Sequence, residues 1–281
     1  MPSYRYRLVN VFAGAPLEGN PLCVFEDARG LDDRTMQALA LQFNLSETTF
    51  ILPSAKATAR VRIYTPTFEM PFAGHPTLGT AHVVRSLLGA PNAVTLEMRA
   101  GIIPVSANGD TWTLSAQAPK TRPPGIDRER LARYLRLAPQ DIGAEPLWVN
   151  TGAEQLIVPL ASVDAVRRAD PDAGTIVDWP RNSIGQAMCY VWAYAGPRNV
   201  ESRFFFTKHT NVIEDPGTGS ACANLGGWML ATSQSLPVDL AVAQGAAVGR
   251  PCRLGLRVTP GREILVSGNV IELGTGVVRL P

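Results

Sequence analysis

The stretch Glu69-Met-Pro-Phe-Ala-Gly-His75 has a counterpart in Glu214-Asp-Pro-Gly-Thr-Gly-Ser220, about half a chain length further on. Both stretches read Glu-x-Pro-x-x-Gly. Each follows a strand-like run that opens with Arg and closes with Thr, and each precedes an apolar run rich in Gly and Ala. One such match arises easily by chance, but a matching strand before it and a matching helix after it favour an internal duplication. The sequence therefore predicts two similar halves.

Shorter similarities extend the repeat toward the N-terminus of each half. Phe50-Ile-Leu52 resembles Tyr190-Val-Trp192, and Val11-Phe-Ala-Gly14 resembles Asn150-Thr-Gly152. The segment Ala118–Gly125 has three prolines and no periodicity, which is typical of a linker. We therefore expect halves over residues 1–118 and 119–281, with the option that the last strand returns to the first half.

Strand-like runs rich in Val, Ile, Phe and Thr alternate with a few helical patterns, which predicts an α+β protein. The apolar runs His75–Leu88 and Ser220–Ala231 are too apolar for surface helices, so each is expected to be the central helix of its half. Asp32–Leu45 and Ile126–Leu137 read as more peripheral helices. The expected strands are Tyr6–Phe12, Leu22–Phe25, Thr48–Leu52, Thr58–Tyr64, Val94–Met98, Trp112–Ser115, Leu147–Asn150, Cys189–Tyr194, Arg203–Thr207, Cys252–Thr259 and Glu263–Ser267.

The composition excludes several classes of protein. The chain has 281 residues, of which 46% are hydrophobic and 18% charged, and its formal net charge is +2. No basic stripe indicates a nucleic-acid partner, and no apolar run approaches the length of a membrane span. Four dispersed cysteines without a CxxC pair, and an N-terminus too polar for a signal peptide, predict a cytoplasmic location with reduced thiols.

The two repeated turns are candidate binding sites for an anion. The first turn of a helix has free N–H groups and a partial positive charge, and small residues let a ligand approach the backbone. Two such turns facing each other across a cleft between the halves would suit a small carboxylate. The competing interpretation is a tight connection in which Ser220 is an ordinary N-cap.

Three ionisable residues are candidates for chemistry. His75 follows Gly74 at a helix start, which favours the neutral imidazole, although a capping or core histidine is the alternative. Asp215 is stabilised as an anion beside the second helix, either to hold a ligand or only to compensate the helix dipole. Glu47 lies between a helix and a strand, where a partly buried glutamate can be a general acid and base but most glutamates are solvated.

The remaining histidines and cysteines give weaker signals. His82 follows His75 on the same apolar helix and is interpreted as structural, whereas His209 has no assigned role. The sequence has no HxH, HxxxH or CxxC spacing for a metal, and no GxGxxG or P-loop for a nucleotide, so no metal or cofactor is expected. Cys222 lies inside the first turn of the second apolar helix and is interpreted as a small buried residue.

Taken together, these motifs resemble the PhzF-like (phenazine biosynthesis) family. The resemblance rests on residues from the first strand to the last third of the chain, while residues 119–182 contribute little. It is carried by Val9-Asn-Val-Phe12, Gly19-Asn-Pro-Leu22, Leu45-Ser-Glu-Thr48, Thr65-Pro66, Pro71-Phe-Ala-Gly-His-Pro-Thr-Leu-Gly-Thr-Ala81 and Asp215-Pro-Gly-Thr-Gly-Ser220.

The resemblance implies a diaminopimelate-epimerase-like fold, in which each half is a curled, mostly antiparallel sheet around a central helix. It implies a cofactor-independent isomerase, commonly a homodimer, with Glu47, His75 and Asp215 as catalytic residues. Gly74, Gly219 and Ser220 would bind the carboxylate of the substrate. The resemblance places Gly74 and Gly219 at the positions of the two cysteines of the related epimerases, so a two-thiol racemase is disfavoured.

Our leading hypothesis is therefore a proton shift on a small carboxylate, with Glu47 as general acid and base. The first alternative is an epimerase or racemase of an amino or hydroxy acid, with Glu47 and a second base such as Cys222. The second alternative is a non-catalytic protein that binds a small acid.

Overall fold

The structure is a computed structural model that describes residues 1–208 and 210–280, and it divides into two compact units. Unit 1 comprises Met1–Ser115 and the chain from Ser267, and unit 2 comprises Ala116–Val266. The long strand β17 (Ile264–Arg279) begins in unit 2 and continues into unit 1. In these two described ranges, no helix has both the length and the apolar character to cross a membrane.

Unit 1 is a sheet that curls around one helix. The other elements are β1 (Ser3–Val11), β2 (Asn20–Phe25), α1 (Asp33–Phe43), β3 (Glu47–Leu52), β4 (Ala59–Tyr64), β5 (Glu69–Met70), α2 (Gly74–Leu88), β6 (Ala93–Met98), β7 (Gly101–Asn108) and β8 (Thr111–Ser115). Strand pairing runs β1–β2–β3–β4–β6–β7–β8–β17 and returns from β17 to β1, so the sheet closes. The pairs β2–β3 and β4–β6 are parallel, whereas β5 pairs only with β4 within residues 1–208 and 210–280.

Unit 2 repeats this arrangement. Its elements are β9 (Lys120–Arg122), α3 (Arg128–Tyr134), β10 (Leu147–Asn150), β11 (Glu154–Pro159), α4 (Val163–Arg168), β12 (Met188–Gly196), β13 (Asn199–Lys208), β14 (Asn211–Asp215), α5 (Gly219–Ala231), β15 (Val238–Gln244) and β16 (Cys252–Val258), with 3₁₀ turns at Pro139–Asp141, Ala173–Asp178 and Ala246–Val248. The pairs β10–β11, β12–β13, β13–β14 and β15–β16 are antiparallel, and β11–β12 and β13–β15 are parallel. The order of elements and the direction of each pair match unit 1, which confirms the predicted duplication.

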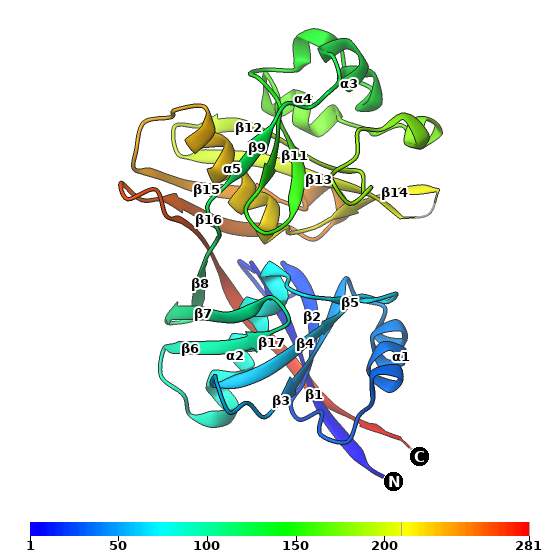
Figure 1. Ribbon diagram of the computed structural model, residues 1–281, viewed down its shortest axis with the longest axis vertical. Coiled ribbons are helices and arrows are strands. Elements are labelled where there is room, and N and C mark those ends of the chain that lie inside the picture. The colour runs from blue at the N-terminus through cyan, green and yellow to red at the C-terminus, as the bar shows by residue number, and fades with distance from the viewer. Residues whose placement is uncertain (209, 281) are drawn as a thin grey trace. The chain divides into compact units, whose positions relative to one another are not determined.

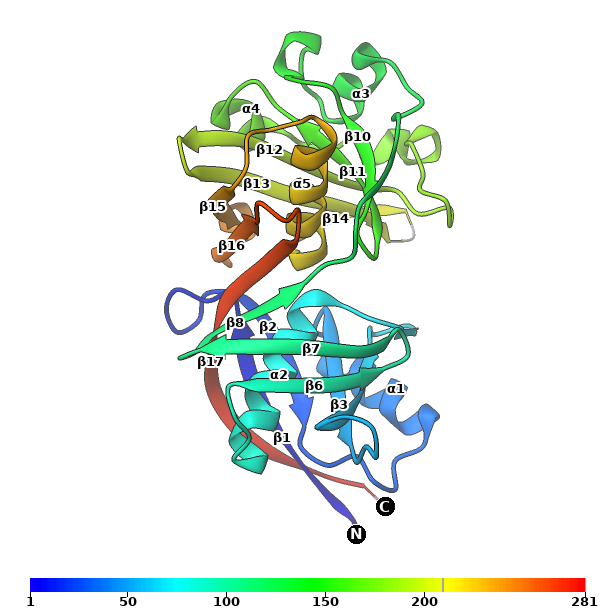
Figure 2. The same ribbon diagram turned by 60° about the vertical axis from the view of Figure 1, so that its left-hand side comes forward.

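Each sheet encloses the apolar helix that the sequence predicts as central. Figure 1 shows α2 among the strands of unit 1, and Figure 2 shows α5 among the strands of unit 2, where it contacts β9, β10, β11 and β16. Glycine lets α2 approach its sheet, because a Cβ on Gly79 would lie 2.7 Å from Leu22 and 2.9 Å from Val11. Gly226 has the same role in α5, where a Cβ would lie 2.9 Å from Ile264. The predicted α+β class and its two similar halves are confirmed.

The segment Ala118–Gly125 is more ordered than predicted. Lys120–Arg122 forms β9, which pairs with β10 in the register Lys120↔Asn150. Prolines flank this strand but do not interrupt it, so it can pair along its length. The predicted linker is therefore wrong over these three residues. The helix predicted over Ile126–Leu137 is likewise shorter and covers Arg128–Tyr134 after an Asp127 cap.

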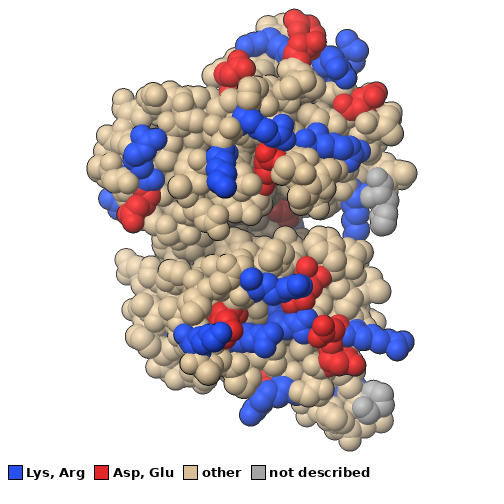
Figure 3. All heavy atoms as spheres, in the orientation of Figure 1, with Lys and Arg blue, Asp and Glu red and all other residues tan. Residues whose placement is uncertain are grey.

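Charged side chains of both signs lie side by side on one face of unit 1. Figure 3 shows Lys and Arg interleaved with Asp and Glu on this face. Arg62 contributes to the pattern through ion pairs with Asp33 and Glu69, and Arg99 also pairs with Glu69.

Candidate active site

Glu47 is the first residue of β3, and its side chain contacts the start of α2. The carboxylate oxygen Oε2 lies 3.4 Å from Nε2 of His75, and the Glu47 side chain is only 15% exposed. The preceding helix α1 ends at Asn44 in a left-handed conformation, and β3 then pairs in parallel with β2 at Leu22↔Glu47. The glutamate is thus fixed at the corner where the chain enters the sheet.

His75 is the second residue of α2 and is buried. Burial lowers the pKa of its imidazole to about 3, and a hydrogen bond to the Pro21 backbone only partly opposes this effect. The other ring nitrogen, Nδ1, lies 3.4 Å from the side-chain amide nitrogen of Asn20. His75 is therefore a neutral imidazole between Asn20 and Glu47, so its contact with Glu47 is a polar contact between a carboxyl group and an uncharged ring.

The starts of α2 and α5 have the same chemistry. Their N-cap residues, Ala73 and Thr218, make no side-chain capping bond among the described residues. The first intrahelical bonds are those from Thr77 N to Ala73 O and from Ala221 N to Thr218 O. The N–H groups of the first two residues of each helix precede these bonds and are not used within the helix. Such groups are suited to binding an anion.

Asp215 is the last residue of β14 and braces the turn before α5. Its carboxylate accepts a hydrogen bond from the Thr218 hydroxyl, and its backbone carbonyl accepts one from Gln244 Nε2 at 2.8 Å. The buried Gln244 also accepts from Thr218 N at 3.2 Å. The acid is half-buried and belongs to a local hydrogen-bond cluster. Bracing the turn accounts for an aspartate here without excluding a ligand.

Ser220 lies one residue after the buried Gly219 in the first turn of α5 and is partly exposed. Its hydroxyl oxygen accepts a hydrogen bond from Gln155 Nε2 at 2.9 Å. Thr218 is the N-cap of α5 and Ser220 is the second residue of the helix, so the interpretation of Ser220 as an ordinary N-cap is wrong. The serine is instead held by a residue of β11.

The other residues singled out in the sequence have less to contribute. Cys222 is fully buried in α5, and burial raises the pKa of its thiol to about 12. His82 accepts a hydrogen bond from Trp112 Nε1 at 3.3 Å, which supports its structural interpretation. His209 lies outside the described residues. Within those residues, no group of three or more His, Cys, Asp or Glu side chains is arranged to hold a metal ion.

The geometry brings the predicted residues together within each unit. Glu47 contacts His75 in unit 1, and Asp215 lies in the turn that leads to Gly219 and Ser220 in unit 2. Sequence reasoning missed the amides that hold these residues: Asn20, Gln155, Asn224 and Gln244. Only Asn20 had a signal, because it lies in the motif Gly19-Asn-Pro-Leu22.

Comparison with known proteins decides the family. The model of a family described as phenazine biosynthesis-like protein matches residues 9–276. The chain belongs to the PhzF-like family of isomerases. An uncharacterised isomerase of Pasteurella multocida is 38% identical to it, over 99% of this chain and 95% of the relative. The trans-2,3-dihydro-3-hydroxyanthranilate isomerase of Pseudomonas aeruginosa is 36% identical, over 97% of this chain and 98% of the relative.

A solved structure of the PhzF-like family agrees. The crystal structure of a Bacillus anthracis phenazine biosynthesis protein of this family matches all of both chains, with a TM-score of 0.88 and 25% identity. The resemblance stated from the sequence is thereby confirmed for both the family and the fold.

Proposed function

We propose that this PhzF-like isomerase shifts a proton within a small carboxylate substrate, with Glu47 as the general acid and base. The observation that carries the proposal is the 3.4 Å contact between Glu47 and His75 Nε2 at the start of α2. A mostly covered carboxyl group beside a neutral imidazole can be held in either protonation state. The ring can donate to the carboxylate through an N–H or accept from the acid through a lone pair.

The proposed reaction balances without a cofactor. The Glu47 carboxylate removes a proton from a carbon of the substrate, and the electron pair of that C–H bond shifts an adjacent double bond. The protonated Glu47 then returns the proton to a different carbon, which gives an isomer and restores the carboxylate. No atom or electron is gained or lost.

The substrate class follows from the charges at the helix starts. The open N–H groups at Gly74 and at Gly219 and Ser220 favour an anionic group such as a carboxylate. We propose that Asp215 and Ser220 bind polar groups of the substrate and that His75 orients the reacting part. The Pseudomonas aeruginosa relative is named for a dihydro-hydroxyanthranilate, which carries a carboxylate, an amine and a hydroxyl, and this compound is the first substrate to test.

The structure disfavours the two-base epimerase. A second base at Cys222 would need an accessible thiolate, but this thiol is fully buried and its pKa is raised to about 12. A single carboxyl group that removes and returns the proton is the simpler arrangement.

Turnover in D₂O tests the proposal. Purified protein is incubated with trans-2,3-dihydro-3-hydroxyanthranilate, and the product is followed by NMR. We expect an isomer with a moved double bond, whose newly protonated carbon carries deuterium to the extent that the Glu47 carboxyl proton exchanges with D₂O before it is returned. Deuterium at an inverted centre with the double bond unmoved would indicate an epimerase. Binding without any turnover or exchange would indicate a non-catalytic binding protein.

A further inference from the structure

Ser220 stands at the end of a chain of hydrogen bonds buried in unit 2. The chain runs from the β10–β11 connection through Asn224 and Gln155 to Ser220. Gln155 and Thr151 are 3% and 6% exposed, and Asn224 is not exposed at all. Buried amides that satisfy one another form an ordered network whose bonds reinforce each other.

The backbone fixes which atom donates at each step. Thr151 N, which can only donate, lies 2.9 Å from Asn224 Oδ1, so this oxygen is the acceptor. The carbonyl of Ala153, which can only accept, lies 2.8 Å from Asn224 Nδ2. Each of the two backbone groups thus determines which atom of the Asn224 amide is oxygen and which is nitrogen, and the two assignments agree.

The direction then passes to Gln155 and Ser220. Asn224 Nδ2 donates to Gln155 Oε1 at 2.7 Å, which leaves Gln155 Nε2 to face Ser220 at 2.9 Å. An amide nitrogen can only donate, so Ser220 Oγ accepts. A hydroxyl that accepts in this way retains its own proton for an acceptor elsewhere.

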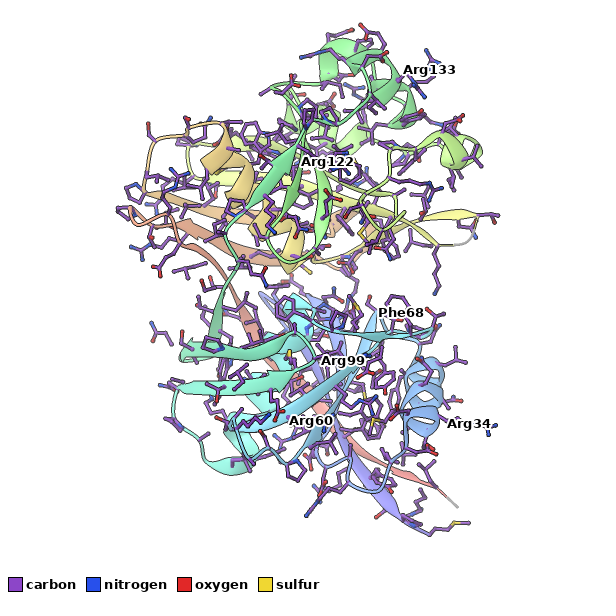
Figure 4. The ribbon with its side chains drawn as sticks, in the orientation of Figure 1. Arg34, Arg60, Phe68, Arg99, Arg122 and Arg133 are labelled. Atoms are coloured by element: carbon purple, nitrogen blue, oxygen red, sulfur yellow. The ribbon has the colours of Figure 1, made fainter. Side chains whose placement is uncertain are left out.

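The neighbouring strand residue keeps Gln155 in place. Successive side chains of a strand point to opposite faces, so Glu154 points away from Gln155. Glu154 accepts from Arg122 Nε on β9 at 2.8 Å and from Ser183 N at 2.5 Å. Arg122 also lies over the ring of Trp148, 4.6 Å from its centroid, and is labelled in Figure 4. The start of β11 is thus anchored on both faces.

The matching positions of unit 1 hold different residues. His75 matches Ser220 in the repeat, and Gly79, one turn further along α2, matches Asn224 on α5. Glycine has no side chain that could relay a hydrogen bond. Asn20, at the start of β2, contacts His75 directly instead. A chain of hydrogen bonds through the position of Asn224 is therefore possible in unit 2 but not at the matching glycine of unit 1.

We propose that Gln155 is a positioning residue that makes Ser220 a hydrogen-bond donor to the carboxylate of the substrate. This inference rests on the proposed function. It names the residues that decide whether the Ser220 hydroxyl donates or accepts a hydrogen bond toward the substrate. The backbone groups of Thr151 and Ala153 fix the orientation of the Asn224 amide. Asn224 in turn fixes the Gln155 amide, whose nitrogen donates to Ser220. The consequence is selectivity for an acceptor such as a carboxylate over a group that can only donate.

The substitution Gln155→Glu tests this direction with almost no change in shape. An ionised glutamate accepts from Asn224 and also from the Ser220 hydroxyl. The Ser220 proton then points to the glutamate and is not donated to the substrate. We expect 3-hydroxyanthranilate, a stable aromatic compound with the same ring substituents, to bind roughly 10- to 100-fold more weakly by calorimetry. Ser220→Ala should weaken binding by a similar factor. Circular dichroism and thermal unfolding establish that each variant is folded.

The double variant separates a relay from simple charge repulsion. If Gln155 acts through Ser220, Gln155→Glu combined with Ser220→Ala binds no more weakly than Ser220→Ala alone. Acidification should also restore the affinity of the Gln155→Glu variant relative to wild type, because a protonated glutamate can again donate to Ser220. Gln155→Met removes the donor without adding a charge. Combined with Ser220→Ala, it allows the same comparison of single and double variants should the glutamate variant not fold.

The outcomes separate the two proposals. Losses that add fully in the double variant, or an unchanged dissociation constant for Gln155→Glu and Gln155→Met, would overturn the relay alone. Wild-type protein that does not bind 3-hydroxyanthranilate would contradict the substrate class of the proposed function, and the relay would fall with it. Non-additive losses together with recovery on acidification would support the relay.

Discussion

Arg62 holds Glu69 through two parallel hydrogen bonds, in which Nε and Nη2 of the arginine donate to the two carboxylate oxygens at 2.8 Å each. Arg203 and Glu214 repeat this pair in unit 2, at 3.1 and 2.7 Å. The glutamates are the first residues of the two repeated motifs. The repeat therefore preserves a clamp between the turn before each central helix and the strand beside it.

Breaking the clamp should destabilise the protein. The side chains of Arg62 and Glu69 are each only 13% exposed, so Glu69→Gln leaves a mostly buried guanidinium with the exposed Asp33 as its remaining charged partner. We expect a loss of about 3 kcal/mol in the free energy of unfolding, measured with urea. Asp110→Asn is the control, because Asp110 is 70% exposed in its pair with Arg85 and should cost below about 1 kcal/mol. Equal losses for the two variants would contradict this assignment.

The neutral His75 should make stability depend on pH. Burial lowers its pKa from 6.5 to about 3 in the folded protein, so between these values the unfolded chain binds a proton that the folded chain does not. This contribution to stability is complete above pH 6.5 and is lost as the pH falls toward 3. By pH 5 the loss should be about 2 kcal/mol relative to pH 7.5. Urea unfolding at both pH values checks this, and His75→Gln should lose less stability over the same interval.

The packing of α2 against its sheet predicts a strong size limit at Gly79. A Cβ there would already lie within 3 Å of Leu22 and Val11, so Gly79→Val should lower the free energy of unfolding by roughly 1–3 kcal/mol or more. Gly274→Val on β17 is the control, since a Cβ at Gly274 meets nothing within 4 Å. A Gly79 variant as stable as the Gly274 variant would show that the helix can move away from the sheet.

The cysteines should be unreactive in the folded protein. All four thiols are buried, and burial raises the pKa of Cys189 and of Cys222 to about 12. We expect Ellman's reagent to label the native protein at pH 7.5 far more slowly than the protein unfolded in guanidinium, in which all four thiols react. Rapid labelling of Cys222 with loss of activity would revive the two-base epimerase.

The sequence identified the repeat and the central helices because both leave local patterns. The Glu-x-Pro-x-x-Gly motifs are readable at a glance, and a wholly apolar helix implies burial on all sides. Short strands such as β5 and β9 depend on a partner far away in the chain, so local propensity does not reveal them. Lys120–Arg122 has a linker-like sequence and becomes a strand only because β10 lies beside it.

The same distinction applies to the site. Glu47 and His75 lie in sequence motifs that are recognisable without the structure. Gln155 is far from Ser220 in the sequence, and Asn224 lies one helical turn after it. An isolated Gln or Asn carries no local signal of a functional role. Their importance lies in the directions of hydrogen bonds, which only a three-dimensional arrangement defines.

The most direct test of the central claim is the turnover of Glu47→Gln. The amide keeps the shape of the side chain but cannot accept a proton from carbon, so we expect kcat on trans-2,3-dihydro-3-hydroxyanthranilate to fall by about 100-fold or more. The dissociation constant of 3-hydroxyanthranilate should stay within about threefold of wild type, and the exposed control Glu263→Gln should be fully active. A Glu47→Gln protein that turns over and exchanges deuterium at the wild-type rate would contradict the account.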